Sequence, residues 1–371
     1  MPSATRPPVD HFTPVSPTKE TIDFVSLRQI DLSTYDDGPE ARSSLAEQVR
    51  LAMTTQGFFI LVNHGISAEE IERQVDIGHT VLSRTSEEDK QRLRAPIREE
   101  GHYFGFKPRG IWTVDGKTKD KIEQFNVYRD LNLHEQPDVL EQYRQEVYEF
   151  VKETHTGVLY KLLRLFAIAL EIEDEEFFVR LHDYERRDLS WFRYMKYYGD
   201  EYESKKDGGK TVWLQGHQDF PCLTLLFSQP MTSLQVRDVS DNAEWKYVPH
   251  VPGAMVINAG EIMQWFTGGY FKAAIHRVVE PPADQRGRSR FGIFYFSVPN
   301  NEVVTNTVLE QSPLLRREGV QMAHKPEDAP TSEQWVTGRV KITGKGDKFE
   351  GKGDAAAEVE KVGNVTTTWF R

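Results

Sequence analysis

Two histidines and one aspartate have the types and the spacing to hold a metal ion. Residues 216–220 read Gly-His-Gln-Asp-Phe, so His217 stands two residues before Asp219, and His276 follows 276 − 219 = 57 residues later. Two imidazoles and one carboxylate form the ligand set that binds iron(II) on one face and leaves the opposite positions open for oxygen and a substrate. A His-x-acid pair alone is weak evidence, because the chain has 11 histidines and 57 acidic residues and such pairs arise by chance.

The segments around these residues resemble buried strands. Residues two apart in an extended strand project from the same face, so His217 and Asp219 can bind one ion. Residues 223–227, 254–258 and 275–279 are short apolar runs, which is typical of buried strands. We therefore expect one rigid sheet to carry all three ligands.

A further predicted strand, residues 290–296, carries a positive charge on one of its faces. Alternation groups the following residues on that face: Arg290, Gly292, Phe294 and Phe296. A guanidinium among aromatic side chains needs a partner, since an unpaired buried charge is costly. A carboxylate ligand held by the guanidinium fork would meet that need.

Together these features resemble the iron(II)- and 2-oxoglutarate-dependent dioxygenases of the isopenicillin N synthase-like group. The pattern of that group is His-x-Asp, a second histidine about fifty residues further on, and then Arg-x-Ser about ten to fifteen residues after that histidine. Here Arg290 follows His276 by 290 − 276 = 14 residues. Residues 57–66, Gly-Phe-Phe-Ile-Leu-Val-Asn-His-Gly-Ile, resemble the amino-terminal signature of the same group, GFF…NHGI. The resemblance covers roughly residues 20 to 320.

The resemblance implies a fold class and a set of cofactors. The fold would be α+β, with a double-stranded β-helix (jelly-roll) core flanked by helices. Iron(II) would be held by His217, Asp219 and His276, and the co-substrate 2-oxoglutarate would contact Arg290 and Tyr197. With O2, and with ascorbate as a helpful reductant, such an enzyme hydroxylates, desaturates or cyclises a small specialised metabolite and releases succinate and CO2.

Two positions depart from the pattern of the group. Gly292 stands where Arg-x-Ser has its serine, so a hydroxyl that in relatives helps the arginine to hold the co-substrate carboxylate is missing. The Asn-Tyr-Tyr-Pro strand of the group corresponds to residues 195–198, Met-Lys-Tyr-Tyr. The resemblance therefore assigns a co-substrate contact to Tyr197 and none to Met195.

Candidate substrate residues come mainly from two aromatic segments. Residues 101–116 combine glycines, a proline and aromatic side chains, which predicts a loop at the substrate entrance; an aromatic loop packed on the core is the alternative. In the predicted strand 191–198, alternation places Arg193 beside Tyr197, where it can recognise an acidic or carbonyl group of the substrate or form a structural ion pair. The predicted substrate residues, which suggest a partly apolar substrate, are Tyr103, Phe104, Trp112, Arg193, Phe220 and Phe296.

The composition narrows the kind of partner and the compartment. The formal net charge is −11, the pI is near 5.6 and no basic stripe alternates with aromatics, so nothing favours nucleic acid or an anionic membrane. No apolar run follows a charged amino terminus, and the longest apolar stretch, residues 159–170, is too short to span a bilayer. The single cysteine, Cys222, fits a reducing compartment. We expect a cytoplasmic protein with a small-molecule substrate, whose oligomeric state stays open.

One catalytic domain with extensions at both ends is expected. Helices are predicted over residues 44–56 and from Ser67 onward, and the apolar spacing from 139 to 170 predicts one long helix or a broken pair. The expected segments are a proline-rich disordered tail (1–20), an amino-terminal dioxygenase module with the substrate loop 101–116 (21–130), scaffold helices (131–185), the jelly-roll core (186–320) and a solvated charged extension (321–371).

Two other functions remain open on the sequence. An oxidase of the same group could use Arg290 for a substrate carboxylate and consume no 2-oxo acid, an idea that the missing serine supports; oxygen consumption with and without 2-oxoglutarate distinguishes it. A non-catalytic metal-binding scaffold is the alternative of another class. The presence of all three ligands disfavours it, and release of succinate would exclude it.

Overall fold

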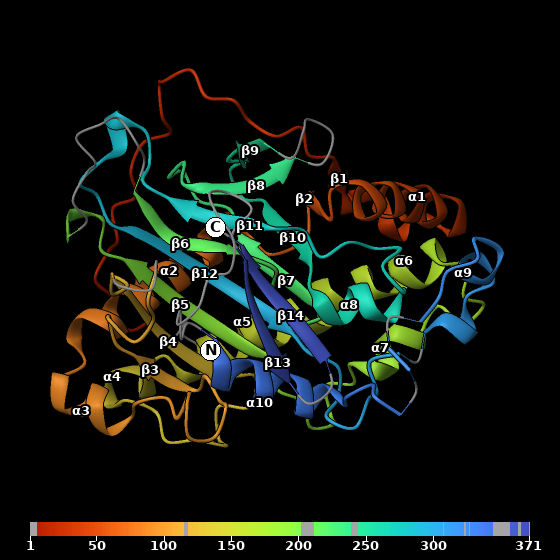
Figure 1. Cartoon of the computed structure of the whole chain (residues 1–371). Helices are drawn as coiled ribbons and strands as arrows, with labels where there is room; N and C mark the ends of the chain where they lie inside the picture. The colour runs from red at the N-terminus through yellow and green to blue at the C-terminus, as the bar shows by residue number, and fades with distance from the viewer. Residues whose placement is uncertain are drawn as a thin grey trace, which may run out of the picture.

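Two β-sheets form the centre of the protein (Figure 1). The larger has the strand order β1-β2-β10-β7-β12-β5-β4-β3, and the smaller has the order β13-β14-β6-β11-β8-β9. The structure is a computed structural model, and the residues that it describes are 6–114, 118–201, 211–238, 244–306, 308–322, 324–325, 327–343, 357–362 and 365–370.

The strands are short and mostly antiparallel. Those of the larger sheet are β1 (Gln29–Asp31), β2 (Phe58–Val62), β3 (Gly105–Lys107), β4 (Ile122–Tyr128), β5 (Trp191–Tyr197), β7 (Leu223–Phe227), β10 (Met255–Ala259) and β12 (Arg290–Ser297). Those of the smaller sheet are β6 (Val212–His217), β8 (Leu234–Asp238), β9 (Glu244–Tyr247), β11 (His276–Val279), β13 (Ala357–Val362) and β14 (Val365–Phe370).

The chain crosses repeatedly between the two sheets. From β6 to β12, strands β6, β8, β9 and β11 belong to the smaller sheet, whereas β7, β10 and β12 belong to the larger one. This alternation makes a double-stranded β-helix, so the predicted α+β jelly-roll fold is confirmed. The expectation that one sheet carries all three ligands is wrong: His217 and His276 lie on the smaller sheet, and Asp219 lies two residues beyond the end of β6.

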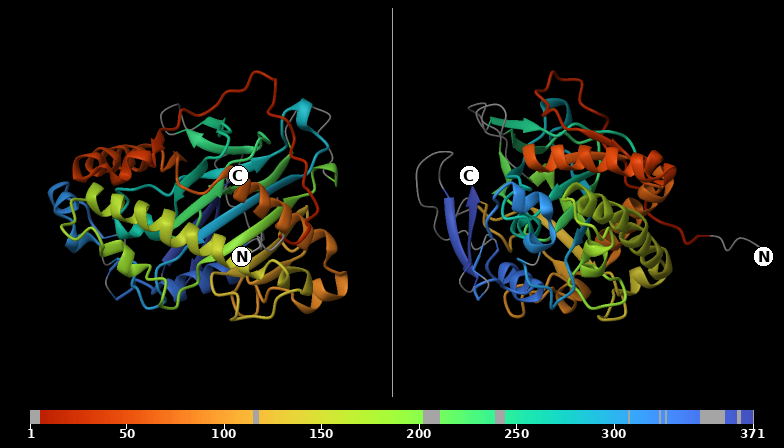
Figure 2. Two further views of the ribbon diagram at one scale, coloured as in Figure 1. Left: turned by 180° about the vertical axis from the view of Figure 1, so that it is seen from behind. Right: turned by 90° about the vertical axis from the view of Figure 1, so that its right-hand side faces the viewer.

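Helices cover the outer face of the larger sheet. Figure 2 shows α1 (red) and α6 (yellow-green) on one side of the sheets and the β13–β14 hairpin (blue) on the other. The helices are α1 (Pro39–Thr55), α2 (Ala68–Arg84), α3 (Glu87–Arg92), α4 (Asp138–Glu141), α5 (Arg144–Glu153), α6 (Tyr160–Ala169), α7 (Phe177–Leu181), α8 (Glu261–Phe266), α9 (Pro313–Arg317) and α10 (Ser332–Ile342), with a π-helical turn over Thr154–Leu159 and 3-10 turns at Leu32–Asp37, Gly199–Glu201, Ala283–Gln285 and Leu309–Gln311.

Strand alternation separates this helical layer from the interior between the sheets. In β5, Phe192 packs its ring against Phe150 of α5, with 5.6 Å between ring centroids, and Tyr194 donates a hydrogen bond from its hydroxyl to Gln74 of α2. The odd-numbered residues of β5, among them Arg193, consequently face the other way, into the space between the sheets.

The predicted helices are confirmed in type and differ at their ends. Ser67 caps α2 through a capping box with Glu70, as the sequence indicates. Helix α1 begins earlier than predicted because Pro39 is well suited to a first helical turn. Residues 144–169 form an almost continuous helix in which the π-helical turn separates α5 from α6. In the described part of the chain, no helix combines the length and the apolar character that crossing a membrane requires.

The amino-terminal segment is ordered where the structure describes it. The backbone N–H of Asp10 donates to Thr80 Oγ1 and that of Phe12 donates to Asp76, both at 2.8 Å. The Phe12 ring packs on Phe291 with 5.3 Å between centroids. The prediction of a disordered tail is therefore wrong for residues 6–20, because prolines prevent a strand ladder but do not prevent an extended segment from packing. Residues 1–5 lie outside the described residues.

The carboxyl-terminal extension is partly built into the fold. In α10, Trp335 is fully buried and contacts Trp265, with 4.2 Å between ring centroids, and Arg339 pairs with Glu261 at 3.2 Å. The prediction of a solvated charged extension over residues 321–371 is wrong for this helix, because the residues that it buries recur at helical spacing and include Trp335 and Val336. The β13–β14 hairpin adds to β6, while residues 344–356 of the extension lie outside the described residues.

We predict that Phe12→Ala lowers the free energy of unfolding by about 1–3 kcal/mol, because it removes a half-buried ring from its contacts with His79 and Phe291. Urea denaturation measures the change. The control is Phe24→Ala, which removes a ring that is 39% exposed and should have a smaller effect. Equal unfolding free energies for Phe12→Ala and the unmodified protein would show that the packing of the Phe12 ring contributes nothing to the stability of the fold.

Candidate active site

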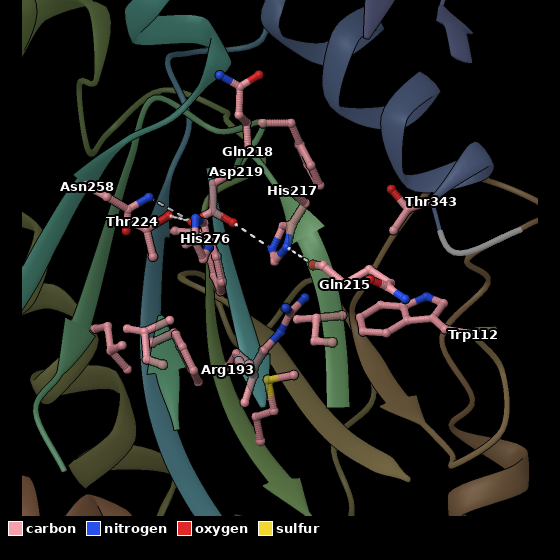
Figure 3. Close-up of a pocket in the computed structure, with 18 of the residues that line it drawn as sticks. Trp112, Arg193, Gln215, His217, Gln218, Asp219, Thr224, Asn258, His276 and Thr343 are labelled. Carbon is pink, nitrogen blue, oxygen red and sulfur yellow. Dashed lines mark hydrogen bonds and ion pairs between the residues drawn. The ribbon is translucent and has the colours of Figure 1, made fainter. Parts of the chain in front are cut away.

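A cavity lies between the two sheets (Figure 3). The larger sheet lines it through Trp191, Arg193, Met195, Tyr197, Thr224, Leu226, Asn258, Arg290, Phe294 and Phe296. The smaller sheet lines it through Leu214, Gln215, His217, Leu234, His276 and Val278. The larger sheet also contributes Phe58 of β2. Segments outside the sheets complete the lining with Tyr103, Trp112, Thr113, Val114, Asp120, Gln218, Asp219, Phe220, Pro221 and Thr343.

The three predicted metal ligands come together in this cavity. His217 ends β6 and His276 begins β11, and they are direct partners in the antiparallel pairing, with 4.4 Å between ring centroids. Asp219 lies in the turn after β6, with Oδ1 3.7 Å from His217 Nε2 and Oδ2 3.7 Å from His276 Nε2. One ligand atom from each residue lies within 4.8 Å of the others, so a single ion can contact all three.

Hydrogen bonds orient both imidazoles for metal binding. His217 Nδ1 donates to the carbonyl of Gln215 at 2.8 Å, and His276 Nδ1 donates to that of Ala274 at 3.2 Å. Because Nδ1 carries the proton in both rings, each Nε2 keeps its lone pair and faces the centre of the cluster. This donor set fits iron(II).

The carboxylate of the cluster is held by hydrogen bonds and by charge. Asp219 Oδ2 accepts from Thr224 Oγ1 at 2.7 Å and from Asn258 Nδ2 at 2.9 Å. Burial opposes ionisation of Asp219, but the two imidazoles and these hydrogen bonds lower its pKa below the ordinary value. Burial, reinforced by His276, lowers the pKa of His217 to about 4. A neutral His217 beside an ionised Asp219 is the combination that a metal ion requires.

Arg290 and Tyr197 lie on the larger sheet. They are direct partners in the β12–β5 pairing, and the guanidinium lies 4.9 Å from the centroid of the Tyr197 ring. Arg290 is 2% exposed and its Nη1 has no hydrogen-bond partner, while burial lowers its pKa and raises the pKa of Tyr197 to about 12. Among the described residues no carboxylate pairs with Arg290. A buried positive charge with an unpaired donor therefore needs an anion, and the distal carboxylate of 2-oxoglutarate fits.

Arg193 is a second buried guanidinium and points into the cavity (Figure 3). Its Nε donates to Asn126 Oδ1 at 2.6 Å, and its Nη2 has no partner. The guanidinium carbon lies 4.8 Å from the centroids of both the Tyr103 and Phe296 rings. The structural ion pair that the sequence left open does not occur within the described part of the chain, where aromatic faces and an amide oxygen surround this charge instead.

The predicted substrate residues line the cavity with one exception. Tyr103, Trp112, Arg193, Phe220 and Phe296 border it. Phe104 does not, because its ring stacks on His134 with 3.4 Å between centroids.

The prediction of a loop over residues 101–116 is wrong in its centre, where Gly105–Lys107 forms β3 and pairs with β4. Alternation along this extended segment turns Phe104 away from the side that Tyr103 faces. Residues 115–117 lie outside the described residues.

Reasoning from the sequence missed several polar residues of the site, and four of them contact its key side chains or border the cavity. Thr224 and Asn258 hold Asp219, and each is a polar side chain within a predicted buried strand, which is a signal that could have identified them. Gln229 contacts Arg290, and Thr343 borders the cavity from the end of α10. Neither of these two carries a local sequence signal, because the contacts arise only when distant segments meet.

Comparison with known families agrees with this geometry. The 2OG-Fe(II) oxygenase superfamily matches residues 189–299, a range that contains the three candidate ligands and Arg290. The family described as non-haem dioxygenase in morphine synthesis N-terminal matches residues 27–149. The two matches together cover most of residues 27–299.

Individual relatives cover most of the chain. Scopoletin 8-hydroxylase of Arabidopsis thaliana is 27% identical over 320 residues, 86% of this chain and 82% of the relative. A 2-oxoglutarate-Fe(II) type oxidoreductase of Aspergillus fumigatus is 26% identical and covers 79% of this chain and 86% of its own. A full-length Neurospora crassa protein, solved in complex with alpha-KG, has the same fold, with a TM-score of 0.69, 20% identity and coverage of 85% of this chain and 95% of that one.

The chain belongs to the iron(II)- and 2-oxoglutarate-dependent dioxygenases. It is an oxidoreductase whose cofactors are iron(II) and 2-oxoglutarate, with O2 as the oxidant. The oxidase without 2-oxoglutarate and the non-catalytic scaffold, both left open by the sequence, are consequently set aside.

We predict that Asp219→Ala abolishes tight iron(II) binding and turnover, because only two imidazoles would remain to hold the ion. Metal content after anaerobic loading and desalting measures the loss. His250→Ala serves as the control, because His250 contacts Ser228 and does not border the cavity. Full iron content in Asp219→Ala would contradict the assignment of the three ligands.

Proposed function

We propose that this dioxygenase binds iron(II) through His217, Asp219 and His276 and anchors 2-oxoglutarate through Arg290 and Tyr197. The observation that supports this most directly is one cavity that holds three converging ligand atoms and a buried guanidinium with an unpaired donor. 2-Oxoglutarate has a 2-oxo acid at one end and a carboxylate at the other. These two ends suit a metal ion and a guanidinium, respectively.

The residues of the cavity have separate tasks in this scheme. When bound, iron(II) and 2-oxoglutarate supply the oxidation of a substrate C–H bond by O2, with release of succinate and CO2. His217, Asp219 and His276 would hold the metal from the side on which their ligand atoms converge, which would leave room for the co-substrate. The aromatic lining excludes water, and the resulting low dielectric strengthens the pairing of Arg290 with an anion.

We infer that the substrate is a small, partly apolar metabolite with an acidic group. The apolar part would lie against Tyr103, Trp112, Phe220 and Phe296, and the acid would pair with Arg193, whose Nη2 is unpaired. Relatives named for small metabolites, such as scopoletin 8-hydroxylase, support a small-molecule substrate. Hydroxylation, desaturation and oxidative cyclisation are all compatible with this site.

We also propose a cytoplasmic location and a single catalytic domain. Cys222 is fully buried, and burial raises the pKa of its thiol, so it behaves as a small apolar core residue rather than a disulfide partner. The proposed limits of the catalytic domain are 21–130 for the amino-terminal module, 131–185 for the scaffold helices and 186–320 for the core. Subcellular fractionation would test the location.

We predict that Arg290→Gln weakens 2-oxoglutarate binding by roughly 2–5 kcal/mol, or about thirty- to several-thousand-fold, because it removes a buried charge that pairs with a carboxylate. Titration of the anaerobic iron(II) enzyme, followed by its metal-to-ligand absorption band, measures the affinity. Arg288→Gln is the matched control, since Arg288 is exposed two residues earlier. If both variants bound 2-oxoglutarate as the unmodified enzyme does, the anchor would lie elsewhere.

We predict that Arg193 discriminates acids from neutral analogues. For the enzyme loaded with iron(II) and 2-oxoglutarate without oxygen, 3-phenylpropanoate should bind about tenfold or more tightly than 3-phenylpropanamide, because only the acid pairs with a buried guanidinium. Quenching of the cavity tryptophans Trp112 and Trp191 reports binding.

Arg193→Leu should remove this preference and leave the affinity for 2-oxoglutarate unchanged. Equal binding of acid and amide by the unmodified enzyme would contradict an acidic substrate.

A further inference from the structure

The surroundings of Arg290 show what occupies the place of the missing serine. Gly292 shares the cavity-facing side of β12 with Arg290 and has no hydroxyl to offer. The end of the Gln229 side chain lies 3.5 Å from the point where a Cβ at position 292 would stand, and the ring of Phe294 lies 2.9 Å from that point. The space beside Arg290 that a serine would enter is therefore shared by an amide and an aromatic ring.

Gln229 reaches Arg290 from the segment that follows β7. With its amide oxygen turned toward the guanidinium, it accepts hydrogen bonds from Arg290 Nε at 2.6 Å and Nη2 at 2.8 Å. Its amide nitrogen then donates to the carbonyl of Phe291 at 2.7 Å. Both ends of the amide are thus satisfied, and the side chain is anchored to the backbone of β12 beside the arginine.

These hydrogen bonds divide the guanidinium into two parts. Gln229 accepts from the edge formed by Nε and Nη2, whereas Nη1 has no partner. A guanidinium offers five N–H donors in a rigid fork, so an acceptor on one edge fixes the direction in which the remaining donors point. Gln229 and Arg290 also border a second cavity, which Phe12 and Val15 of the amino-terminal segment line as well.

We propose that Gln229 is a positioning residue for the co-substrate: it takes over the supporting role of the missing serine, holds Arg290 by its Nε–Nη2 edge and leaves Nη1 for the distal carboxylate of 2-oxoglutarate. The inference rests on the proposed role of Arg290. An amide suits the task because it accepts two hydrogen bonds without a charge. The full positive charge of Arg290 therefore remains available to an anion.

The chemistry of the amide predicts opposite effects on folding and on co-substrate binding. Gln229→Glu keeps the shape and the acceptor atoms but adds a negative charge that pairs with Arg290. This variant should unfold at the same or a higher temperature than the unmodified enzyme, and yet bind 2-oxoglutarate about tenfold or more weakly, since the arginine is already neutralised. Gln229→Leu should also weaken binding about tenfold or more, because Nε and Nη2 lose their acceptor.

The experiment measures 2-oxoglutarate affinity in the anaerobic iron(II) enzyme from the metal-to-ligand absorption band, together with thermal unfolding and iron content. Gln235→Glu is the matched control, because Gln235 also accepts from an arginine, Arg277 Nε at 2.9 Å, but does not border the cavity. In steady-state assays of Gln229→Glu, the KM for 2-oxoglutarate should rise about tenfold or more while kcat at saturating 2-oxoglutarate stays within about twofold.

Two results would overturn the inference, and both can be distinguished from a failure of the proposed function. If Gln229→Glu binds 2-oxoglutarate as tightly as the unmodified enzyme does, the amide does not control the anchor. If Gln235→Glu loses as much affinity as Gln229→Glu, the effect is a general consequence of added charge. If the unmodified enzyme shows no absorption band with 2-oxoglutarate, or Arg290→Gln keeps full affinity, the proposed anchor itself is wrong.

Discussion

The pairing of β6 with β11 is the interaction on which the site depends. His217 and His276 are 276 − 217 = 59 residues apart in the chain, yet they are direct partners across an antiparallel pair. Because side chains alternate along a strand, a slip of one residue in this register would turn one imidazole to the outer face of the sheet. The backbone hydrogen bonds of two short strands therefore set the distance between the two nitrogen ligands, and Asp219 needs only a short turn to join them.

Charge within the cavity is opposite to the charge of the whole molecule. The chain carries a formal net charge of −11, but Arg193 and Arg290 both present unpaired donors inside an aromatic lining. Asp120 also borders the cavity, where Lys107 neutralises it at 2.7 Å. Since Asp219 is held between imidazoles, the charge left unpaired in the cavity is positive, as the proposed anionic ligands require. The net charge of the whole chain therefore does not predict the sign of the charge inside its cavity.

Both ends of the chain contribute to the core in ways that a catalytic motif does not reveal. Trp335 of α10 donates a hydrogen bond from Nε1 to the carbonyl of Phe220 at 3.2 Å, and Phe220 borders the cavity next to Asp219. At the other end, Phe12 packs behind β12 against Phe291, one residue from Arg290. Segments that the sequence marks as extensions thus support the surroundings of both Asp219 and Arg290.

The sequence alone determined whatever depends on local pattern and ligand chemistry. Strand alternation placed Arg193 and Tyr197 on one face, the types and order of His217, Asp219 and His276 indicated the metal, and a capping serine marked the start of α2. The fold class followed from the resemblance that these motifs carry.

Tertiary structure decided the contacts made between segments far apart in the chain. Phe104 faces away from the cavity because β3 pairs with β4, and Gln229 meets Arg290 although no local pattern links them. Residues 6–20 and α10 are ordered because the core offers apolar surfaces that only the folded chain creates. Local periodicity specifies which face a side chain occupies, whereas the partner on that face is chosen by packing among distant segments.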